Sequence, residues 1–183
     1  LDPDLALMRV PVAHARSLAL TADGRFLVAG NWQRSIQIWR ADTGDLVTTR
    51  PASASADAED RIRCVDVSPG AIDENAAVVT AHASGWLCLW RLLDGELVAK
   101  APCPGASNLS IAAAFHPDGS RVVSISGDAS VRVFDVPKLE QLAVRVEAES
   151  ETRSLDVTRD GRLVAGSFDA TVRLYELDGL VPL

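Results

Sequence analysis

The sequence predicts an all-β protein built from four consecutive four-stranded antiparallel units. Three observations carry this prediction: apolar and polar residues alternate over short runs, Asp-Gly pairs mark turns between runs, and the whole pattern recurs four times. Equivalent aromatic residues are spaced by roughly 40 to 50 positions, a period that indicates propeller blades rather than helical solenoids. They are Trp39, Trp90, Phe134 and Tyr175.

Each unit opens with an alternating run that predicts its first strand. These runs cover residues 17–21, 63–68, 111–116 and 153–158. Three of them lead into an Asp-Gly turn, in which glycine tolerates the positive φ of a tight hairpin. The turns are Asp23-Gly24, Asp118-Gly119 and Asp160-Gly161, and the second unit replaces this pattern with SPGAIDEN.

Two further strands and a short turn follow in each unit, within residues 25–44, 76–95, 121–138 and 162–179. A fourth strand follows in the first three units, at 46–49, 96–100 and 141–146. The tail of the last unit, GLVPL, is short and contains a proline, so residues 5–12 are expected either to supply its missing outer strand or to finish a preceding unit. The predicted blades cover residues 14–50, 62–101, 109–147 and 153–183, with residues 1–13 as the outer strand of a preceding or closing blade.

The segments SGDASVRVFD (126–135) and GSFDATVRLYE (166–176), with the HPDG and TRDG turns before them, resemble the core of a WD repeat. This resemblance extends over residues 14 to 179. It implies a β-propeller of WD-repeat type. Because WD-repeat propellers more often resemble seven-bladed rings, and because the chain starts at Leu1, we expect the four blades to be part of a larger ring.

The resemblance also implies structural roles and marks departures. In the family, an aspartate between the second and third strands joins a hydrogen-bonded set with His, Ser or Thr, and Trp. Asp128 and Asp169 match that structural turn aspartate, whereas Gln33 and Ser84 replace it in the first two repeats. The expected Gly-His pair is missing, with His14 the nearest histidine. The sequence therefore predicts incomplete sets, with blade rigidity supplied by apolar packing.

Composition narrows the function classes. The net charge of −7 argues against direct nucleic-acid contact. Three cysteines without CxxC spacing, Cys64, Cys88 and Cys103, indicate neither a disulfide framework nor zinc, and favour a reducing compartment. No apolar segment and no leader suggests membrane insertion or secretion. We therefore expect an intracellular, cytoplasmic protein, with nuclear or ciliary location left open.

An arginine recurs just before the first strand of three repeats, at Arg16, Arg63 and Arg153, with Ile111 in the third repeat. Propeller geometry places this position near the channel mouth. Guanidinium groups there can grip an acidic tail, a phosphopeptide or a phosphate. The alternative is salt bridging to Asp66, Asp156, Glu151 or the DAED run at 57–60.

Two aromatic residues, Trp32 and Phe168, occupy equivalent turns on the same predicted face. Large exposed aromatics are typical anchors for a partner, and Ala83 and Gly127 at the matching positions show that blade packing does not require bulk there. The alternative is packing onto a neighbouring blade. The insertion PASASADAED (51–60) is expected to be a mobile surface loop.

These features favour a non-catalytic protein-interaction scaffold within a larger intracellular complex. The sequence indicates no catalytic residues, no metal site and no cofactor, and its partners are expected to be proteins of a multiprotein assembly rather than a membrane. The predicted partner-binding residues are Arg16, Trp32, Arg63, Arg153 and Phe168. Recognition of a peptide or small ligand by the top face and central channel is the alternative. A metal-dependent enzyme using Asp66 and Asp156 is a third class that the sequence supports least.

Overall fold

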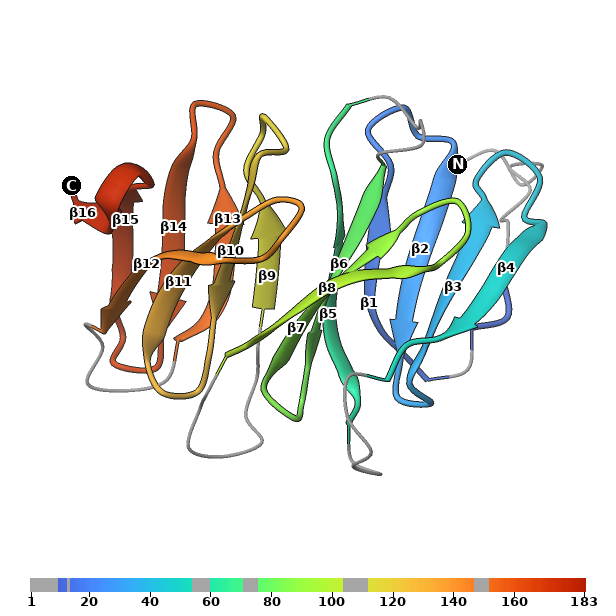
Figure 1. Ribbon diagram of the computed structural model, residues 1–183, viewed down its shortest axis with the longest axis horizontal. Coiled ribbons are helices and arrows are strands. Elements are labelled where there is room, and N and C mark those ends of the chain that lie inside the picture. Colours follow the sequence, from blue (N-terminus) through green and yellow to red (C-terminus); the bar gives the residue numbers. More distant parts are fainter. Residues whose placement is uncertain (1–9, 13, 54–59, 71–75, 104–111, 147–151) are drawn as a thin grey trace, which may run out of the picture.

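The computed structural model describes residues 10–12, 14–53, 60–70, 76–103, 112–146 and 152–183. Within these ranges the chain forms four antiparallel sheets of four strands each (Figure 1). This confirms the predicted all-β fold of four four-stranded units. The first two sheets are β1 (Ala15–Leu20), β2 (Phe26–Asn31), β3 (Ser35–Arg40) and β4 (Leu46–Pro51), and β5 (Ile62–Val67), β6 (Ala77–His82), β7 (Trp86–Arg91) and β8 (Leu97–Pro102). The last two are β9 (Ala112–Phe115), β10 (Arg121–Ile125), β11 (Ser130–Asp135) and β12 (Gln141–Val146), and β13 (Thr152–Val157), β14 (Arg162–Ser167), β15 (Val172–Glu176) and β16 (Val181–Pro182).

The Asp-Gly turns form as predicted. Gly24, Gly119 and Gly161 have φ values of 71°, 76° and 82°, a left-handed conformation that costs glycine little because it has no Cβ. In the first of these turns Asp23 accepts hydrogen bonds from the Thr21 hydroxyl, at 2.8 Å, and from a backbone N–H, at 3.0 Å. The aspartate therefore closes the turn while the glycine supplies its conformation.

The last sheet obtains its fourth strand from its own tail. The short strand β16 pairs with the outer edge of β15, with Pro182 opposite Tyr175. A short 3₁₀ turn, η1 (Asp178–Leu180), precedes β16 and places Leu180 in the core at 1% exposure. The expectation that this sheet lacks an outer strand is therefore wrong, because an edge strand tolerates a proline that has no N–H to donate. Residues 1–9 and 13 lie outside the described residues, so their predicted role as an outer strand stays a prediction.

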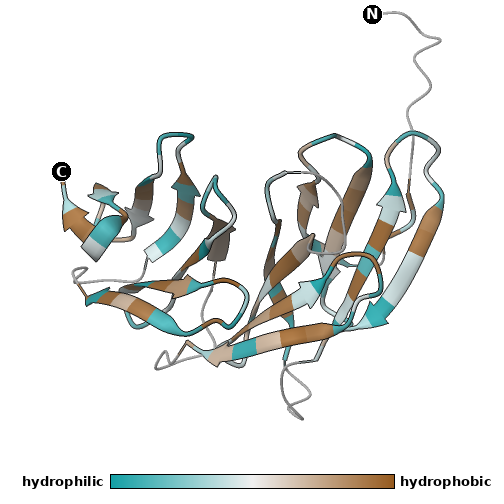
Figure 2. Cartoon of the chain, turned by 45° about the horizontal axis from the view of Figure 1, so that its top comes forward, coloured by the Kyte–Doolittle hydropathy of each residue, from teal (hydrophilic) through white to brown (hydrophobic). Residues whose placement is uncertain are grey.

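The apolar residues gather between successive sheets. Figure 2 shows hydrophobic residues concentrated along the strands and hydrophilic ones at many of the turns. Three clusters fill the three spaces between neighbouring sheets: Val28 and Val78 belong to the first, Leu87 and Val122 to the second, and Ile125 and Leu163 to the third. All six are fully buried, and burying one such side chain stabilises a fold by about 1.5–3 kcal/mol. The sheets are thus held together by face-to-face packing.

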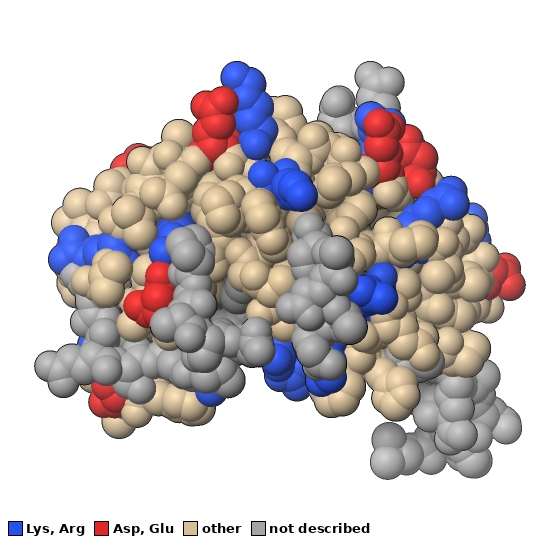
Figure 3. Space-filling model, turned by 60° about the horizontal axis from the view of Figure 1, so that its bottom comes forward, with Lys and Arg blue, Asp and Glu red and all other residues tan. Residues whose placement is uncertain are grey.

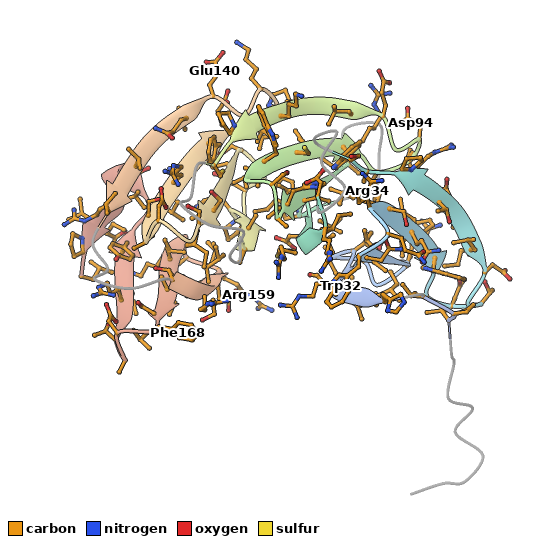
Figure 4. The ribbon with its side chains drawn as sticks, turned by 90° about the horizontal axis from the view of Figure 1, so that it is seen from below. Trp32, Arg34, Asp94, Glu140, Arg159 and Phe168 are labelled. Carbon is orange, nitrogen blue, oxygen red and sulfur yellow. The ribbon has the colours of Figure 1, made fainter. Side chains whose placement is uncertain are left out.

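The four sheets follow an open arc. The inner strands β1, β5, β9 and β13 contact one another in succession along its concave side, and the first and last sheets stand at its two ends (Figure 4). The outer faces of these end sheets expose apolar side chains, Leu18 and Leu20 on β1 and Val172 and Leu174 on β15. On the other side of each end sheet, apolar side chains are buried against the neighbouring sheet, among them Val28 in the first sheet and Leu163 in the last.

Candidate functional site

The three recurring arginines occupy the same structural position. The pairing of β1 with β2 skips Arg16, that of β5 with β6 skips Arg63, and that of β13 with β14 skips Arg153. Each arginine is therefore the extra residue of a β-bulge, a feature that redirects a side chain out of the regular ladder. The matching residue of the third sheet, Ile111, lies outside the described residues. The recurrence is visible in the sequence, whereas the bulge is visible only in the structure.

These side chains converge at one end of the inner strands. Arg63 is half-buried, and burial lowers the pKa of its guanidinium, with the neighbouring charges of Arg16, Arg61 and Arg153 lowering it further. Figure 3 shows basic side chains at several places on this side of the molecule, among them a group at the lower edge of the view, midway between the two ends. We call these four residues the arginine mouth. Arg61 was missed by sequence reasoning because it lies two positions before the recurring arginine and has no counterpart in the other repeats.

Both predicted aromatic anchors are exposed, and each contacts a member of the arginine mouth. Trp32 lies in the β2–β3 turn with 47% of its surface exposed, and Phe168 in the β14–β15 turn with 65% exposed. The Arg61 guanidinium lies 5.1 Å from the centre of the Trp32 ring, and that of Arg153 4.5 Å from the centre of the Phe168 ring. We call Trp32 and Phe168 the aromatic rim. They belong to the first and last sheets (Figure 4). Because each ring contacts an arginine of the mouth, the arginine mouth and the aromatic rim form one surface.

A second ring contact restrains Trp32. The ring of His14 stacks on it, with centroids 6.2 Å apart and planes inclined by 8°. The Trp32 backbone N–H also approaches the His14 carbonyl oxygen, at 3.4 Å. These contacts hold the tryptophan in the turn while leaving about half of its surface exposed. Neither Trp32 nor Phe168 packs into the space between two sheets.

Asp128 organises the β10–β11 turn. It accepts hydrogen bonds from the Ser130 backbone N–H, at 3.0 Å, and from the Arg132 guanidinium, at 2.6 Å, and Ser126 donates a further bond. Burial alone would raise the pKa of Asp128, but hydrogen bonds from Arg132, Ser126 and Ser130 outweigh it and lower the pKa to about 2. Arg132 is 6% exposed, so this ion pair fixes the turn from inside the sheet.

Asp169 occupies the same place in the last sheet. Its carboxylate accepts from the Arg173 guanidinium at 2.7 Å and from the Thr171 backbone N–H at 3.0 Å. The hydrogen bond with Arg173, followed by that with the Thr171 hydroxyl, holds the pKa of Asp169 well below its usual range. In both turns an arginine four residues later takes the charged partner's role, which the family resemblance would assign to a histidine.

The second sheet contains a relay of buried polar contacts that was not predicted from the sequence. Trp90 Nε1 donates to Thr80 Oγ1 at 2.7 Å, Thr80 Oγ1 lies 2.8 Å from His82 Nε2, and His82 Nδ1 lies 3.2 Å from Asp60 Oδ1. Ser84 also donates to Asp60. Asp60 and His82 are both fully buried. The second sheet therefore brings a Trp, a Thr, a His and an Asp into contact, although the sequence predicts incomplete sets.

The relay went unnoticed because two of its members have exchanged places. Where the family pattern has a histidine before the first strand and an aspartate in the later turn, this sheet has Asp60 before β5 and His82 at the end of β6. The burial of Asp60 also shows that residues 51–60 are not a mobile surface loop over their whole length. Ala52 and Asp60 at its two ends are fully buried, and residues 54–59 lie outside the described residues.

The remaining chemistry serves the fold. Asp66 accepts backbone hydrogen bonds from Phe115, at 2.8 Å, and Val67, at 2.9 Å, and so ties β5 to β9. Burial raises the pKa of Asp66, and the charge of Asp156 adds to this. Over the ranges that the structure describes, no group of three or more His, Cys, Asp or Glu side chains could hold a metal ion. All three cysteines are free.

Two further observations concern a groove and the helical segments. A groove of about 760 Å³ lies on the opposite face, between the second and third sheets, and is lined mainly by Leu89, Leu93, Val98 and Val136 with Asp94 at its rim. None of the helical segments in the described part of the chain has the length and apolar character needed to cross a membrane.

Comparisons with known proteins agree with this geometry. The family profile "WD domain, G-beta repeat" matches residues 7–40, 103–135 and 144–176, together more than half of the chain. It passes over the second sheet, where the aspartate and histidine have exchanged places. Pre-mRNA-processing factor 19 homolog 2 of Arabidopsis thaliana is 24% identical over 161 residues, which cover 88% of this chain and 30% of that protein. The tRNA (guanine-N(7)-)-methyltransferase non-catalytic subunit of Caenorhabditis elegans is 32% identical over 136 residues, covering 70% of this chain and 32% of that protein.

The chain thus spans about a third of the length of these two relatives. Among solved structures, the crystal structure of the computationally designed Ika4 protein superimposes with a TM-score of 0.72 at 21% identity. The match covers 93% of this chain and 95% of that one. It shows the fold alone.

Proposed function

The chain belongs to the WD-repeat family, and on that premise we propose that it is a non-catalytic protein-interaction scaffold within a larger intracellular complex. Relatives named as a pre-mRNA-processing factor and as a non-catalytic subunit support a role inside an assembly. They also support an intracellular site of action. The finer assignment to the cytoplasm rests on the sequence alone.

One observation carries the proposal: the aromatic rim lies exposed beside the arginine mouth. Trp32 and Phe168 expose 47% and 65% of their surfaces on a single face. Tryptophan and arginine are among the residues most enriched at the energetic centre of protein interfaces. Each ring is also oriented by a guanidinium within about 6 Å, the range of cation-π attraction. The rim is therefore ordered before any partner arrives, which reduces the entropy lost on binding.

The test compares what co-purifies with the full-length protein from its source. Replacing Trp32 and Phe168 together by serine is expected to lower the recovery of specific partner subunits by about tenfold or more, measured by quantitative mass spectrometry. Both side chains are exposed, so the double variant should retain its thermal midpoint. The matched control is Leu142→Ser on β12, a 59% exposed apolar residue away from this face.

Equal recovery of partners by the rim variant and the control would overturn the rim as a binding surface.

Charge reversal offers an independent test of the same face. Arg63→Glu combined with Arg153→Glu is expected to reduce partner capture while the sheets remain folded. Unchanged capture by that variant would remove the arginines from the proposed interface.

We also propose that the four sheets form part of a larger ring. The supporting observation is the pair of apolar outer faces at the ends of the arc, since a sheet normally covers such a face by packing. A native mass spectrum of the endogenous protein tests this proposal. A chain well above 19.5 kDa in a heavy assembly supports an extended ring and a scaffold. A single 19.5 kDa chain would mean that four sheets suffice.

A further inference from the structure

The outer face of the last sheet carries residues of the same kind, at the same positions, as those that join sheets elsewhere in the molecule. Strand register aligns the four sheets position by position, so a residue of one sheet has a counterpart in the others. On the last sheet these positions are exposed. They are Ser154 and Asp156 on β13, Arg162 on β14, and Val172 and Leu174 on β15.

Asp156 repeats a side chain that ties two inner strands together. Its counterpart in the second sheet is Asp66, which accepts the backbone N–H of Phe115 in the third sheet at 2.8 Å. Both carboxylates also accept the N–H of the next residue in their own strand, Val67 or Val157, at 2.9 Å. Asp156 is therefore held in the same way as Asp66, but on a face that is exposed to solvent. A carboxylate there can accept a further backbone N–H.

Ser154 repeats a second tie of this kind on the same strand. Its counterpart in the first sheet is Ser17, whose hydroxyl oxygen accepts the backbone N–H of Val65 in the second sheet at 3.0 Å. Ser154 is exposed. The last sheet therefore presents two acceptors at positions from which other sheets hold the next inner strand.

The apolar residues of β15 lack the cover that their counterparts have. Val172 is 71% exposed and Leu174 39% exposed. In the first sheet the same positions are Ile36 and Ile38, which are 3% and 4% exposed because the second sheet packs on them. The outer face of the last sheet thus has the apolar residues of a packed face.

Arg162 and Asp42 place opposite charges at the two ends of the arc. Between the third and fourth sheets, the Arg121 guanidinium pairs with Asp178 at 2.5 Å. The counterpart of Arg121 in the last sheet is Arg162, and the counterpart of Asp178 in the first sheet is Asp42. Each already pairs within its own sheet, yet 47% and 58% of these side chains stay exposed.

The first sheet presents the complementary half of such a junction. Its strand β1 exposes Leu18 and Leu20, at 57% and 58%. They correspond to Val65 and Phe115, whose N–H groups are held by the preceding sheet inside the molecule. At the position of Asp42 the second and third sheets have uncharged residues. Among these sheets, the first is therefore the one whose charge matches the last.

We propose that the last sheet of one molecule packs on the first sheet of a second copy of the same chain. The two faces lie at opposite ends of the arc (Figure 4), so they do not meet within one chain. A contact between two different faces closes into a ring when the rotation between copies permits it. Two copies about a two-fold axis would form the junction twice and close a ring of eight sheets, within the usual range for propellers. This inference rests on the larger ring proposed above and names its other half.

The parts of this junction have different roles. Burial of the apolar residues on both faces favours association. The backbone hydrogen bonds to Ser154 and Asp156 fix the register of the two inner strands. The pair of Arg162 with Asp42 selects the partner, because charges at an interface favour a matched surface and penalise a mismatched one.

The first experiment measures the mass of the full-length protein by size-exclusion chromatography with multi-angle light scattering, over a dilution series. The wild type is expected at twice the mass of one chain. Val172→Asp places a charge on the proposed junction and is expected to give the mass of one chain at the same concentrations. The matched control is Val146→Asp on β12, a 66% exposed valine away from both end faces. It should keep twice the mass.

An exchange of charges identifies the two faces. Arg162→Asp and Asp42→Arg each place like charges at both junctions, and each is expected to raise the dissociation constant of the pair by about tenfold or more. An equimolar mixture of these two variants restores opposite charges at both junctions. The mixture should therefore recover the wild-type affinity, and a native mass spectrum should show one copy of each variant. Lys138→Asp, at a side chain 70% exposed in the β11–β12 turn, makes the same change of charge and should have no effect.

A wild type with the mass of one chain throughout would overturn the inference, as would a mixture that associates no better than its two components. A double mass that survives Val172→Asp would assign the pairing to another surface. Equal weakening by Lys138→Asp would also overturn it, since the effect would then follow overall charge.

The thermal midpoint of Val172→Asp separates this inference from the larger ring. In a protein with the mass of one chain, a lowered midpoint would mean that further sheets of the same chain cover the face, and the larger ring would stand. An unchanged midpoint would remove the larger ring as well. The scaffold function is judged separately, by the recovery of native partners with the Trp32 and Phe168 double variant.

Discussion

Thr80 occupies the middle of the buried relay, where its hydroxyl oxygen accepts a hydrogen bond from Trp90 Nε1 and lies 2.8 Å from His82 Nε2. His82 Nδ1 in turn lies 3.2 Å from Asp60 Oδ1. A single hydroxyl therefore satisfies two other buried polar groups.

Replacing Thr80 by the isosteric valine should be strongly destabilising. The change leaves Trp90 Nε1 and His82 Nε2 buried without their partner, and each such group costs about 1–3 kcal/mol. We expect the free energy of unfolding, measured by urea denaturation, to fall by about 2–4 kcal/mol. Thr49→Val on the exposed face of β4 serves as control and should change it by less than about 0.5 kcal/mol. Equal effects of the two variants would contradict the relay's structural role.

Asp128 predicts a loss of stability in acid. Its pKa is lowered from 3.8 to about 2 in the folded protein, since hydrogen bonds outweigh the effect of burial. A depressed pKa stabilises the fold above pH 3.8, and this stabilisation is lost as pH falls toward 2. With allowance for solvent at a side chain 26% exposed, the contribution at neutral pH is about 1–2 kcal/mol.

The variant Asp128→Asn isolates this effect. The difference in unfolding free energy between wild type and variant should be about 1–2 kcal/mol at pH 7 and should shrink toward zero near pH 2. Urea titrations at several pH values measure it. A difference that stays constant over this range would mean that the turn depends on the shape of the side chain and not on its charge.

Single residues were predictable from sequence where repeats could be aligned. Trp32 and Phe168 stood out because their equivalents, Ala83 and Gly127, are small, and both rings are indeed exposed. Arg61 and the pairing of His82 with Asp60 were not predictable in this way. Their partners are fixed by how one sheet packs and by where a loop ends, and neither leaves a periodic signal in the chain.

At the scale of elements, the C-terminal tail acts as an anchor for the last sheet. Leu180 is 1% exposed in the core between the third and fourth sheets, and its carbonyl oxygen accepts a hydrogen bond from Arg145 at 3.1 Å. Leu180→Ala is expected to lower the unfolding free energy by about 2–4 kcal/mol because it leaves a cavity. Leu142→Ala on β12, 59% exposed, should cost less than about 0.5 kcal/mol. Urea denaturation distinguishes the two outcomes, and similar losses would contradict the anchoring role.

Most strands were predictable because their alternation and turn residues agree. The Asp-Gly turns set the first hairpins, and the apolar positions of β3, β7 and β11 are buried as packing requires. The tail was misjudged since a two-residue strand beside a proline carries no alternation. Its pairing depends on Leu180 entering a core that other elements build.

At the scale of the molecule, the open arc leaves two apolar faces uncovered. If further sheets cover them, a charge there must disturb the assembly. Leu20→Lys on β1, at a residue 58% exposed, is expected to lower the thermal midpoint of the full-length protein, because a sheet packed there would bury the charge. Leu97→Lys on the outer strand β8, 41% exposed, should leave the midpoint unchanged. An unchanged midpoint in both variants would show that nothing packs on the β1 face.

The bulges at Arg16, Arg63 and Arg153 separate recognition from architecture. A bulged residue has no cross-strand partner in the ladder, so exchanging its side chain leaves strand register and core packing intact. New ligand preferences can therefore arise by one substitution at a time around the inner strands. A designer could recode this surface for a cationic or neutral ligand by choosing three side chains, with the same four sheets beneath them.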